Sequence, residues 1–281
     1  MSVGAAVVGS AFGPTNPFQT GIALRFAGMP GLSLPGLRFG LLVGAVAVWI
    51  MWTLAMTSRD NVRPEATAAA GKATARDVVL LATVLIPFVP YVIGVLRYDW
   101  GFNELSALFL VAGFTLGLVA GRSMSDTAIG FLKGMESMLA AGLFVGVARS
   151  ISIALADGQV LDTILFALAA PLARVPGDVA VALMVPMHAL LSVPVPSVSG
   201  HAVLTMPIMG PLADLVGRSR DAAVIAYQTG AGLTDMITPT NGALLAMLFS
   251  ARVTYGRWVS FAIPGALLVA LVGFAGIVLA R

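Results

Sequence analysis

Four stretches of uncharged, apolar residues constrain this chain more than any other feature. They cover residues 39–56, 78–96, 105–121 and 258–280. A helix needs about 20 apolar residues, with a range of about 17–25, to cross a bilayer. Of the 281 residues, 58% are hydrophobic and only 10% are charged, whereas soluble domains carry about 25% charged residues. The pattern predicts an all-α polytopic membrane protein and excludes an ordinary soluble enzyme, a nucleic-acid-binding domain and a disordered chain.

Residues that usually carry catalysis are scarce. The chain has no cysteine and only two histidines, His188 and His201, so it has no disulfide framework and no thiol nucleophile. A Walker-type phosphate-binding loop is also missing from the sequence. We therefore expect no enzyme activity and no cofactor, and we expect any energy that the protein uses to come from an ion gradient. Neither the composition nor the motifs indicate a nucleic-acid partner.

One basic segment suggests an orientation in the membrane. Residues 58–76 contain Arg59, Arg63, Lys72 and Arg76. Cytoplasmic loops carry an excess of such residues, so we interpret this segment as a cytoplasmic linker in a multi-pass membrane protein.

Two further apolar segments are interrupted by the same three residues. Residues 2–29 contain Pro14-Thr15-Asn16, and residues 222–251 contain Pro239-Thr240-Asn241, at an offset of 225. Each triplet leads into a short apolar half-helix, then a turn with arginine, then an uncharged span. Threading through the membrane makes the two copies enter from opposite sides, which is typical of an inverted-repeat transporter with broken helices.

The physical reason to expect a function there is the backbone. Peptide groups freed by a break cannot stay unsatisfied in hydrocarbon, so they line a cavity or bind something. Unwound carbonyls favour cations, and threonine and asparagine add neutral oxygen ligands that suit a hard cation such as Na⁺. The alternative is that each proline only kinks a span.

A third apolar stretch is too long for one crossing. Residues 179–213 include no Asp, Glu, Lys or Arg, and their middle, residues 194–200, reads PVPSVSG. Two full crossings would put this turn in water, and a re-entrant hairpin would put it at membrane depth. The lack of any charge near the turn favours the hairpin.

The same motifs resemble a known family. Residues 199–215 (SGHAVLTMPIMGPLADL) look like the hairpin signature of the YfcC/DcuC-type anaerobic C4-dicarboxylate carriers, in the ion transporter superfamily. Residues 226–230 (AYQTG), running into 238–242 (TPTNG), are similar to the family's second broken helix. Residues 16–23 (NPFQTGIA) are similar to its first. The resemblance covers essentially the whole chain.

This resemblance implies a fold of two inverted repeats, each with a re-entrant hairpin and a broken helix, in a homodimer surrounded by membrane lipid. Residues 1–57 would be a remnant of the first repeat, and residues 77–281 a complete second repeat. In the second repeat, the hairpin would cover 178–217, the broken helix 221–251 and the final span 257–280. The first repeat would be incomplete, without its scaffold helices and hairpin.

The expected substrate and ion site follows from the motifs. One half-site would use the hairpin tip and the second break, and the other half-site the first break. The residues are Ser197, Ser199, Gly200, His201, Asp235, Thr238, Pro239, Thr240 and Asn241, with Thr15, Asn16 and Pro17. Na⁺ would be held by Ser199, Thr238 and Asn241, and H⁺ is the other candidate coupling ion.

Two of these residues have structural alternatives. Asp235 is an ionisable group at membrane depth and therefore a functional candidate, but it could instead cap the broken helix or pair with an arginine. His201 could contact a carboxylate or titrate, or be a neutral, hydrogen-bonded residue at a helix start. We interpret His188, in the middle of a hairpin arm, as structural.

The function that follows is secondary active transport of a small carboxylate or amino acid, of the C4-dicarboxylate or basic amino acid class. The alternative is a transport-inactive fragment, or one subunit of a split transporter.

Overall fold

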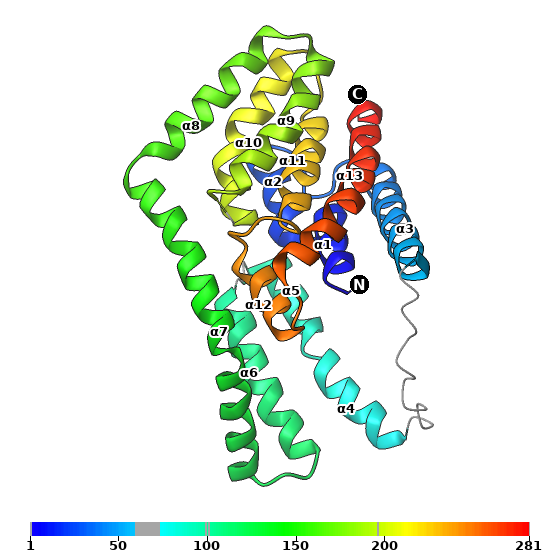
Figure 1. The fold of residues 1–281 in the computed structure, drawn as a ribbon, viewed down its shortest axis with the longest axis vertical. Helices are drawn as coiled ribbons and strands as arrows, with labels where there is room; N and C mark the ends of the chain where they lie inside the picture. Colours follow the sequence, from blue (N-terminus) through cyan, green and yellow to red (C-terminus); the bar gives the residue numbers. More distant parts are fainter. Residues whose placement is uncertain (1, 60–73, 99, 101, 196, 281) are drawn as a thin grey trace. The chain divides into compact units, whose positions relative to one another are not determined.

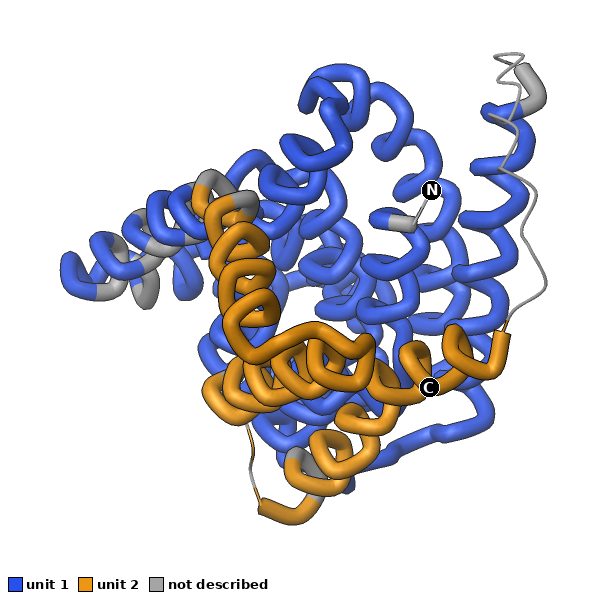
Figure 2. The backbone as a smooth tube through the Cα atoms, turned by 90° about the horizontal axis from the view of Figure 1, so that it is seen from below, with its two compact units in different colours: residues 1–60, 140–281 blue, residues 61–139 orange. Residues whose placement is uncertain are grey.

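The computed structural model describes residues 2–59, 74–98, 100, 102–195 and 197–280. These residues form helices joined by turns, and no strand occurs among them (Figure 1). The chain divides into two compact units, residues 1–60 with 140–281, and residues 61–139 (Figure 2). Most of the predicted linker, residues 60–73, lies outside the described residues.

The N-terminal segment is broken where the sequence predicts. Helix α1 (Ser2–Phe12) is followed by a short π-helix, η1 (Pro17–Gly21), and then by α2 (Ile22–Phe26). Helix α3 (Pro35–Arg59) is the long apolar helix that follows.

The second unit holds α4 (Ala75–Leu85), α5 (Phe88–Tyr98) and α6 (Phe102–Val119), and α7 (Met124–Asp157) begins in it. The predicted span 78–96 is divided by a turn at residues 86–87. The cause is Pro87, because proline has no N–H for the preceding turn of the helix and its ring clashes there.

The remaining elements form the second half of the first unit. They are α8 (Val160–Ala169), the 3₁₀-helix η2 (Ala170–Arg174), α9 (Gly177–Ser192), α10 (Val198–Leu215), α11 (Arg220–Thr234), α12 (Gly242–Ser250) and α13 (Tyr255–Leu279). The arms of the predicted hairpin are α9 and α10, and the second broken helix is α11 with α12.

Three helical stretches of the described chain are long and apolar enough to cross a membrane, one of which combines α4 with most of α5. They cover Pro35–Thr57, Ala75–Gly94 and Tyr255–Leu279. The fourth predicted span corresponds to a shorter apolar helix over Asn103–Val119. Together with the composition, these helices identify a membrane-embedded, all-helical protein.

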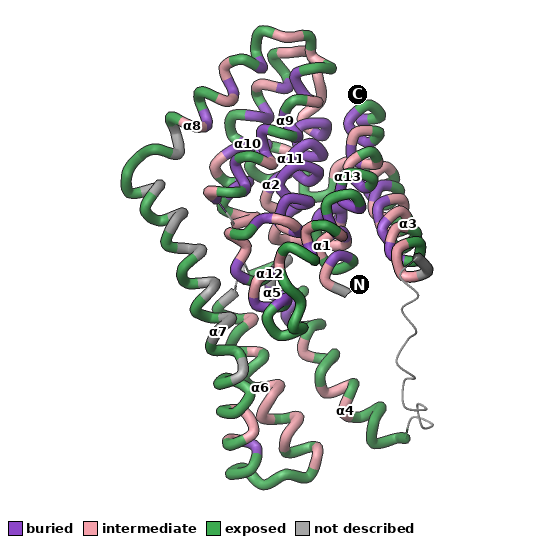
Figure 3. The backbone as a smooth tube through the Cα atoms, viewed as in Figure 1, coloured by how far each residue is buried: buried purple, intermediate pink, exposed green. Residues whose placement is uncertain are grey.

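Helix α11 is the centre of the first unit. Every residue from Asp221 to Thr234 is buried, and Figure 3 shows the buried positions gathered on α11 and its neighbours. The contact with α9 is so close that a Cβ at Gly230 would lie 2.2 Å from the carbonyl oxygen of Val185. Glycine is therefore the residue that lets these two backbones meet.

A buried ion pair ties α3 to α11. The guanidinium of Arg38, 2% exposed, lies 2.7 Å from the carboxylate of Asp221 and donates to the side chain of Gln228 at 2.7 Å. The Arg38 Nε donates to the carbonyl of Ser33 at 2.8 Å, and the Ser33 hydroxyl donates to Asp221 at 2.6 Å. All the buried charge in this cluster is therefore paired and hydrogen-bonded.

Replacing Arg38 with methionine should be strongly destabilising, because it leaves the Asp221 carboxylate and the Gln228 amide oxygen buried without a partner. We expect a loss of about 3–5 kcal/mol in the free energy of unfolding, measured by denaturant unfolding of the purified chain in detergent. Arg257→Met, at an exposed position, is the matched control and should change the stability by about 0.5 kcal/mol or less. Equal effects of the two substitutions would show that the ion pair is unimportant.

Candidate functional site

The break between α11 and α12 leaves three consecutive carbonyls without helical partners. The Asp235 carbonyl accepts from the Nδ2 of Asn241 at 2.9 Å, and the Met236 carbonyl accepts from the indole N–H of Trp258 at 2.7 Å. The Ile237 carbonyl accepts from the hydroxyl of Tyr255. The freed backbone is thus satisfied by side chains, and two of them come from α13, which the sequence motifs did not include.

The break after α1 is satisfied in the same manner. The carbonyl of Ser10 accepts from the Nδ2 of Asn16 at 2.9 Å, and the carbonyl of Gly13 accepts from the Thr20 hydroxyl at 2.7 Å. The carbonyl of Ala11 accepts from the Nε2 of Gln228 at 2.7 Å. Gln228 belongs to α11 and also bonds Arg38, so the first break is connected to the buried ion pair.

The two asparagines of the repeated triplet make matching bonds. Each donates from Nδ2 to the carbonyl six residues earlier, and from its backbone N–H to the carbonyl three residues earlier, at 3.1 Å for Asn16 and 3.3 Å for Asn241. Each also accepts an N–H of the following helix at Oδ1, from Phe18 at 3.0 Å and from Leu244 at 3.2 Å. The triplets therefore share a structural role as helix N-caps.

The likeness extends to the far ends of the half-helices. Gly28 and Arg252, just past α2 and α12, both have positive φ, at 71° and 53°. They lie 224 residues apart, whereas the asparagines lie 225 apart. The π-helix η1 accounts for the difference, because a π-helical turn accommodates one additional residue.

The hairpin tip is bonded to the second broken helix from both of its arms. The Thr240 hydroxyl donates to the carbonyl of Val193, at the end of α9, at 2.6 Å. The Tyr227 hydroxyl donates to the carbonyl of Val198, at the start of α10, at 2.7 Å. Figure 1 shows α9, α10 and α11 grouped together. Thr240 therefore joins the tip to the second break, and Tyr227 joins it to the middle of α11.

The predicted residues of the second half-site are brought together in part. The hydroxyls of Thr238 and Thr240 are 2.7 Å apart. Ser197 caps α10, with its hydroxyl accepting from the N–H of Gly200 at 3.2 Å. Ser199 is half-buried, and its hydroxyl has no hydrogen-bond partner in the described part of the chain. Gly200 and Pro239 are exposed.

The residues predicted for the first half-site differ in their exposure. Thr15 is exposed, and Asn16 and Pro17 are half-buried. The residue that the sequence reasoning missed is Gln19, which is 1% exposed and whose Nε2 lacks a partner. A Cβ at Gly232 of α11 would lie 2.5 Å from that nitrogen, so the first break packs against α11 three residues before Asp235.

His201 lies in the interior of the hairpin. Its side chain is buried, with Nε2 lying 2.9 Å from the Nδ1 of His188 and Nδ1 lying 3.4 Å from the Ser192 hydroxyl. Both rings also stack near Tyr227, at centroid distances of 5.6 and 5.5 Å. The structure therefore joins His201 to His188, a partnership that the sequence spacing did not reveal.

Asp235 is the unpaired charge of this region. Residues 177–250 include six charged residues, and five of them are in ion pairs: Asp178 with Arg218, Asp214 with Arg220 at 2.7 Å, and Asp221 with Arg38. Asp235 is half-buried at the end of α11, and its carboxylate has neither an ion pair nor a hydrogen bond among the described residues. It caps α11 through its backbone, not its side chain.

Two broken helices, and a helical hairpin bonded to one of them, define this chain as a membrane-embedded, all-helical protein. Residues 2–281 match the family of the C4-dicarboxylate anaerobic carrier, DcuC, and the chain belongs to this family.

Two curated relatives cover most of the chain. An "Uncharacterized protein" of Haemophilus influenzae is 32% identical over 92% of this chain and 55% of its own length. The "Putative basic amino acid antiporter YfcC" of Escherichia coli (strain K12) is 30% identical over 90% of this chain and 55% of its own length. The chain thus spans about half the length of these relatives. No solved structure matches it.

Asn241→Ala should destabilise the fold more than an ordinary cap substitution, because it removes an N-cap and also the donor to the Asp235 carbonyl. Cap removal alone costs about 0.5–2 kcal/mol, and the orphaned carbonyl adds about 1–3 kcal/mol. Asn241→Asp keeps the cap acceptor and removes only the donor, so it should lower the free energy of unfolding by less than Asn241→Ala does. Denaturant unfolding in detergent measures both, and an Asn241→Ala variant as stable as the parent would contradict this bonding.

The hairpin geometry also predicts the tautomers of its histidines. The Ser192 hydroxyl donates to the carbonyl of His188 at 2.9 Å, so its lone pair accepts from the Nδ1 of His201. The Nε2 of His201 then accepts from the Nδ1 of His188. We expect ¹⁵N NMR of the purified protein to find both rings protonated at Nδ1 when neutral. An Nε2-protonated His201 would reverse this assignment.

Proposed function

We propose that the protein is a secondary active transporter of a small carboxylate or amino acid across the bacterial inner membrane, driven by a gradient of Na⁺ or H⁺. Membership of a carrier family supports this proposal. The observation that carries it is the pair of broken helices with matching asparagine bonds, one of which is joined to a hairpin tip. Transporters with inverted repeats place their sites at such breaks.

In the proposed mechanism, the hairpin tip and the second break form one half-site and Thr15, Asn16 and Pro17 contribute to the other. Because the carbonyls of residues 235–237 already accept side-chain donors, the ligands for Na⁺ would be chiefly side-chain oxygens, including those of Ser199, Thr238 and Asn241. The matching local structure supports an inverted repeat, and alternating access would follow from movement of the hairpin-bearing part against a scaffold. A homodimer is part of the same proposal.

Asp235 favours one of the two substrate classes. An unpaired, half-buried carboxylate needs a cation, and a basic amino acid offers one on its side chain, whereas a dicarboxylate would add two further negative charges. The name of the Escherichia coli relative agrees with this choice. We therefore infer a basic amino acid as the substrate and assign Asp235 to its cationic group.

Asp235→Asn tests the assignment. The purified chain is reconstituted in liposomes, and counterflow of radiolabelled arginine or lysine is compared with that of succinate. Loss of a charge-assisted contact of about 1.5–3 kcal/mol corresponds to roughly tenfold to hundredfold weaker transport of the basic amino acid. Asp214→Asn is the matched control, because Asp214 is paired with Arg220 outside the site, and it should leave counterflow unchanged.

Other outcomes separate the alternatives. If the chain transports succinate and Asp235→Asn has no effect, the inferred substrate class is wrong, but the proposed carrier activity stands. Absence of counterflow for both substrate classes in correctly folded protein would favour the second candidate, in which this chain is transport-inactive alone or works as one part of a split transporter.

A further inference from the structure

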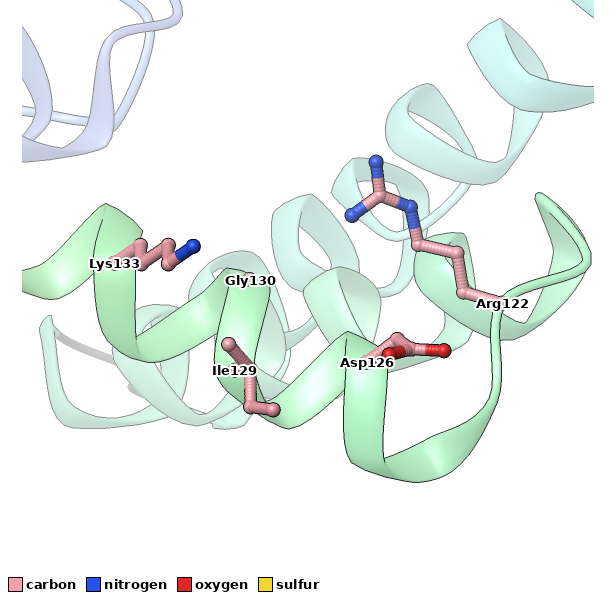
Figure 4. Close-up of a pocket in the computed structure, with 5 residues that line it drawn as sticks. All are labelled: Arg122, Asp126, Ile129, Gly130 and Lys133. Atoms are coloured by element: carbon pink, nitrogen blue, oxygen red, sulfur yellow. The ribbon is translucent and has the colours of Figure 1, made fainter.

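The second unit contains a basic pocket that has no part in the proposed transport site. Near this pocket, Arg76 donates to the carbonyl of Ala120 at 2.8 Å and so joins the start of α4 to the end of α6. The pocket has a volume of about 370 Å³ and is lined by residues that follow α6 in the chain: Arg122, Asp126, Ile129, Gly130 and Lys133 (Figure 4).

The pocket has the geometry of an anion site. Figure 4 shows the side chains of Arg122 and Lys133 reaching toward one another across Gly130. A Cβ at Gly130 would lie 3.4 Å from a terminal nitrogen of Arg122, so glycine leaves the space between the cations open. Among the described residues, neither cation has an ion pair or a hydrogen bond.

The one carboxylate of the pocket is already engaged. Asp126 accepts from the hydroxyl of Ser123 at 2.6 Å, and its own N–H donates to that hydroxyl at 3.0 Å. Figure 4 shows the carboxylate pointing toward the turn before α7, away from the space over Gly130. Asp126 thus serves the helix start, and the two cations keep their charge for a ligand.

An apolar groove continues from this pocket. A second cavity of about 900 Å³ shares Arg122 and Gly130 with the first and runs between α4, α6 and α7. Its walls include Leu80, Leu116, Phe131 and Met138. A small soluble anion would occupy only the pocket and make no contact with this groove, whereas a phosphate that carries an acyl chain would fill both cavities.

We propose that this pocket and groove bind an anionic phospholipid, with the phosphate between Arg122 and Lys133 and an acyl chain along the groove. Guanidinium and ammonium groups together suit a phosphate, and basic pockets between membrane helices recognise anionic headgroups. Lys133 lies about ten residues beyond the start of α7, and the flexible stem of its side chain can bring the ammonium to the headgroup level.

The test is the dissociation constant of lipid on the purified chain in detergent, measured by native mass spectrometry with phosphatidylglycerol, phosphatidylcholine and glycerol 3-phosphate. Each basic residue near a membrane surface contributes about fivefold to anion affinity, so phosphatidylglycerol should bind at least tenfold more tightly than phosphatidylcholine. Arg122→Gln and Lys133→Gln should each lose about fivefold of this affinity. Arg257→Gln, in the other unit, should lose none.

The groove is tested independently by Gly134→Leu. Gly134 lines the groove, and a Cβ there meets no atom within 4 Å, so leucine fits the fold and fills the space of the acyl chain. Leucine is also a better helix former than glycine, so the unliganded melting temperature should stay equal or rise while phosphatidylglycerol binding falls.

Three results would overturn the proposal. Equal affinity for phosphatidylcholine and phosphatidylglycerol would mean that the pocket does not select an anionic headgroup. Binding of glycerol 3-phosphate as tight as that of the lipid, or no effect of Gly134→Leu, would mean an anion site without a lipid. Because the readout is binding and not transport, the result is independent of the proposed carrier activity.

Discussion

Backbone groups that leave a helix inside an apolar environment must find partners, and this requirement organises the first unit. The second break is satisfied by Asn241 from its own loop and by Tyr255 and Trp258 from α13. The first break is satisfied by Asn16 and Thr20 locally and by Gln228 from α11. Each break can therefore exist only when the neighbouring helices are in place, and the unsatisfied alternative would cost several kcal/mol per group.

Helix α11 is where these requirements meet. Gly230 and Gly232 allow α9 and the first break to approach its backbone, and Gln228 links the first break to Arg38 and Asp221. Charges this deeply buried are tolerated because each has both an ion pair and further hydrogen bonds. Asp235, at the end of the same helix, is the exception in the described region. The cation site that we propose at Asp235, and the substrate class inferred from it, rest on this contrast.

The sequence predicted much of the architecture because the governing signals are local. The long uncharged runs indicate the spans, and the Pro-Thr-Asn triplets indicate both breaks. The turn at residues 194–200 separates the two hairpin arms. Pro87 divides a run that composition alone treats as one helix. The details of the site were less accessible. The sequence indicated free carbonyls for a cation, whereas Trp258 and Tyr255, about 20 residues further along the chain, occupy those carbonyls. No spacing rule would find these partners, nor the contact of Gln228 with the carbonyl of Ala11.

The sequence by itself determined that the chain is an all-helical membrane protein with two interrupted helices, because hydrophobic length, proline and asparagine act on their own immediate backbone. The tertiary structure alone decided which side chains satisfy the breaks, that His201 pairs with His188 inside the hairpin, and that Asp235 is left unpaired. It also decided that Arg122 and Lys133 share a pocket above an apolar groove. The physical reason is that hydrogen bonds and ion pairs depend on distances of about 3 Å between atoms, and such distances between remote residues arise only when the helices pack.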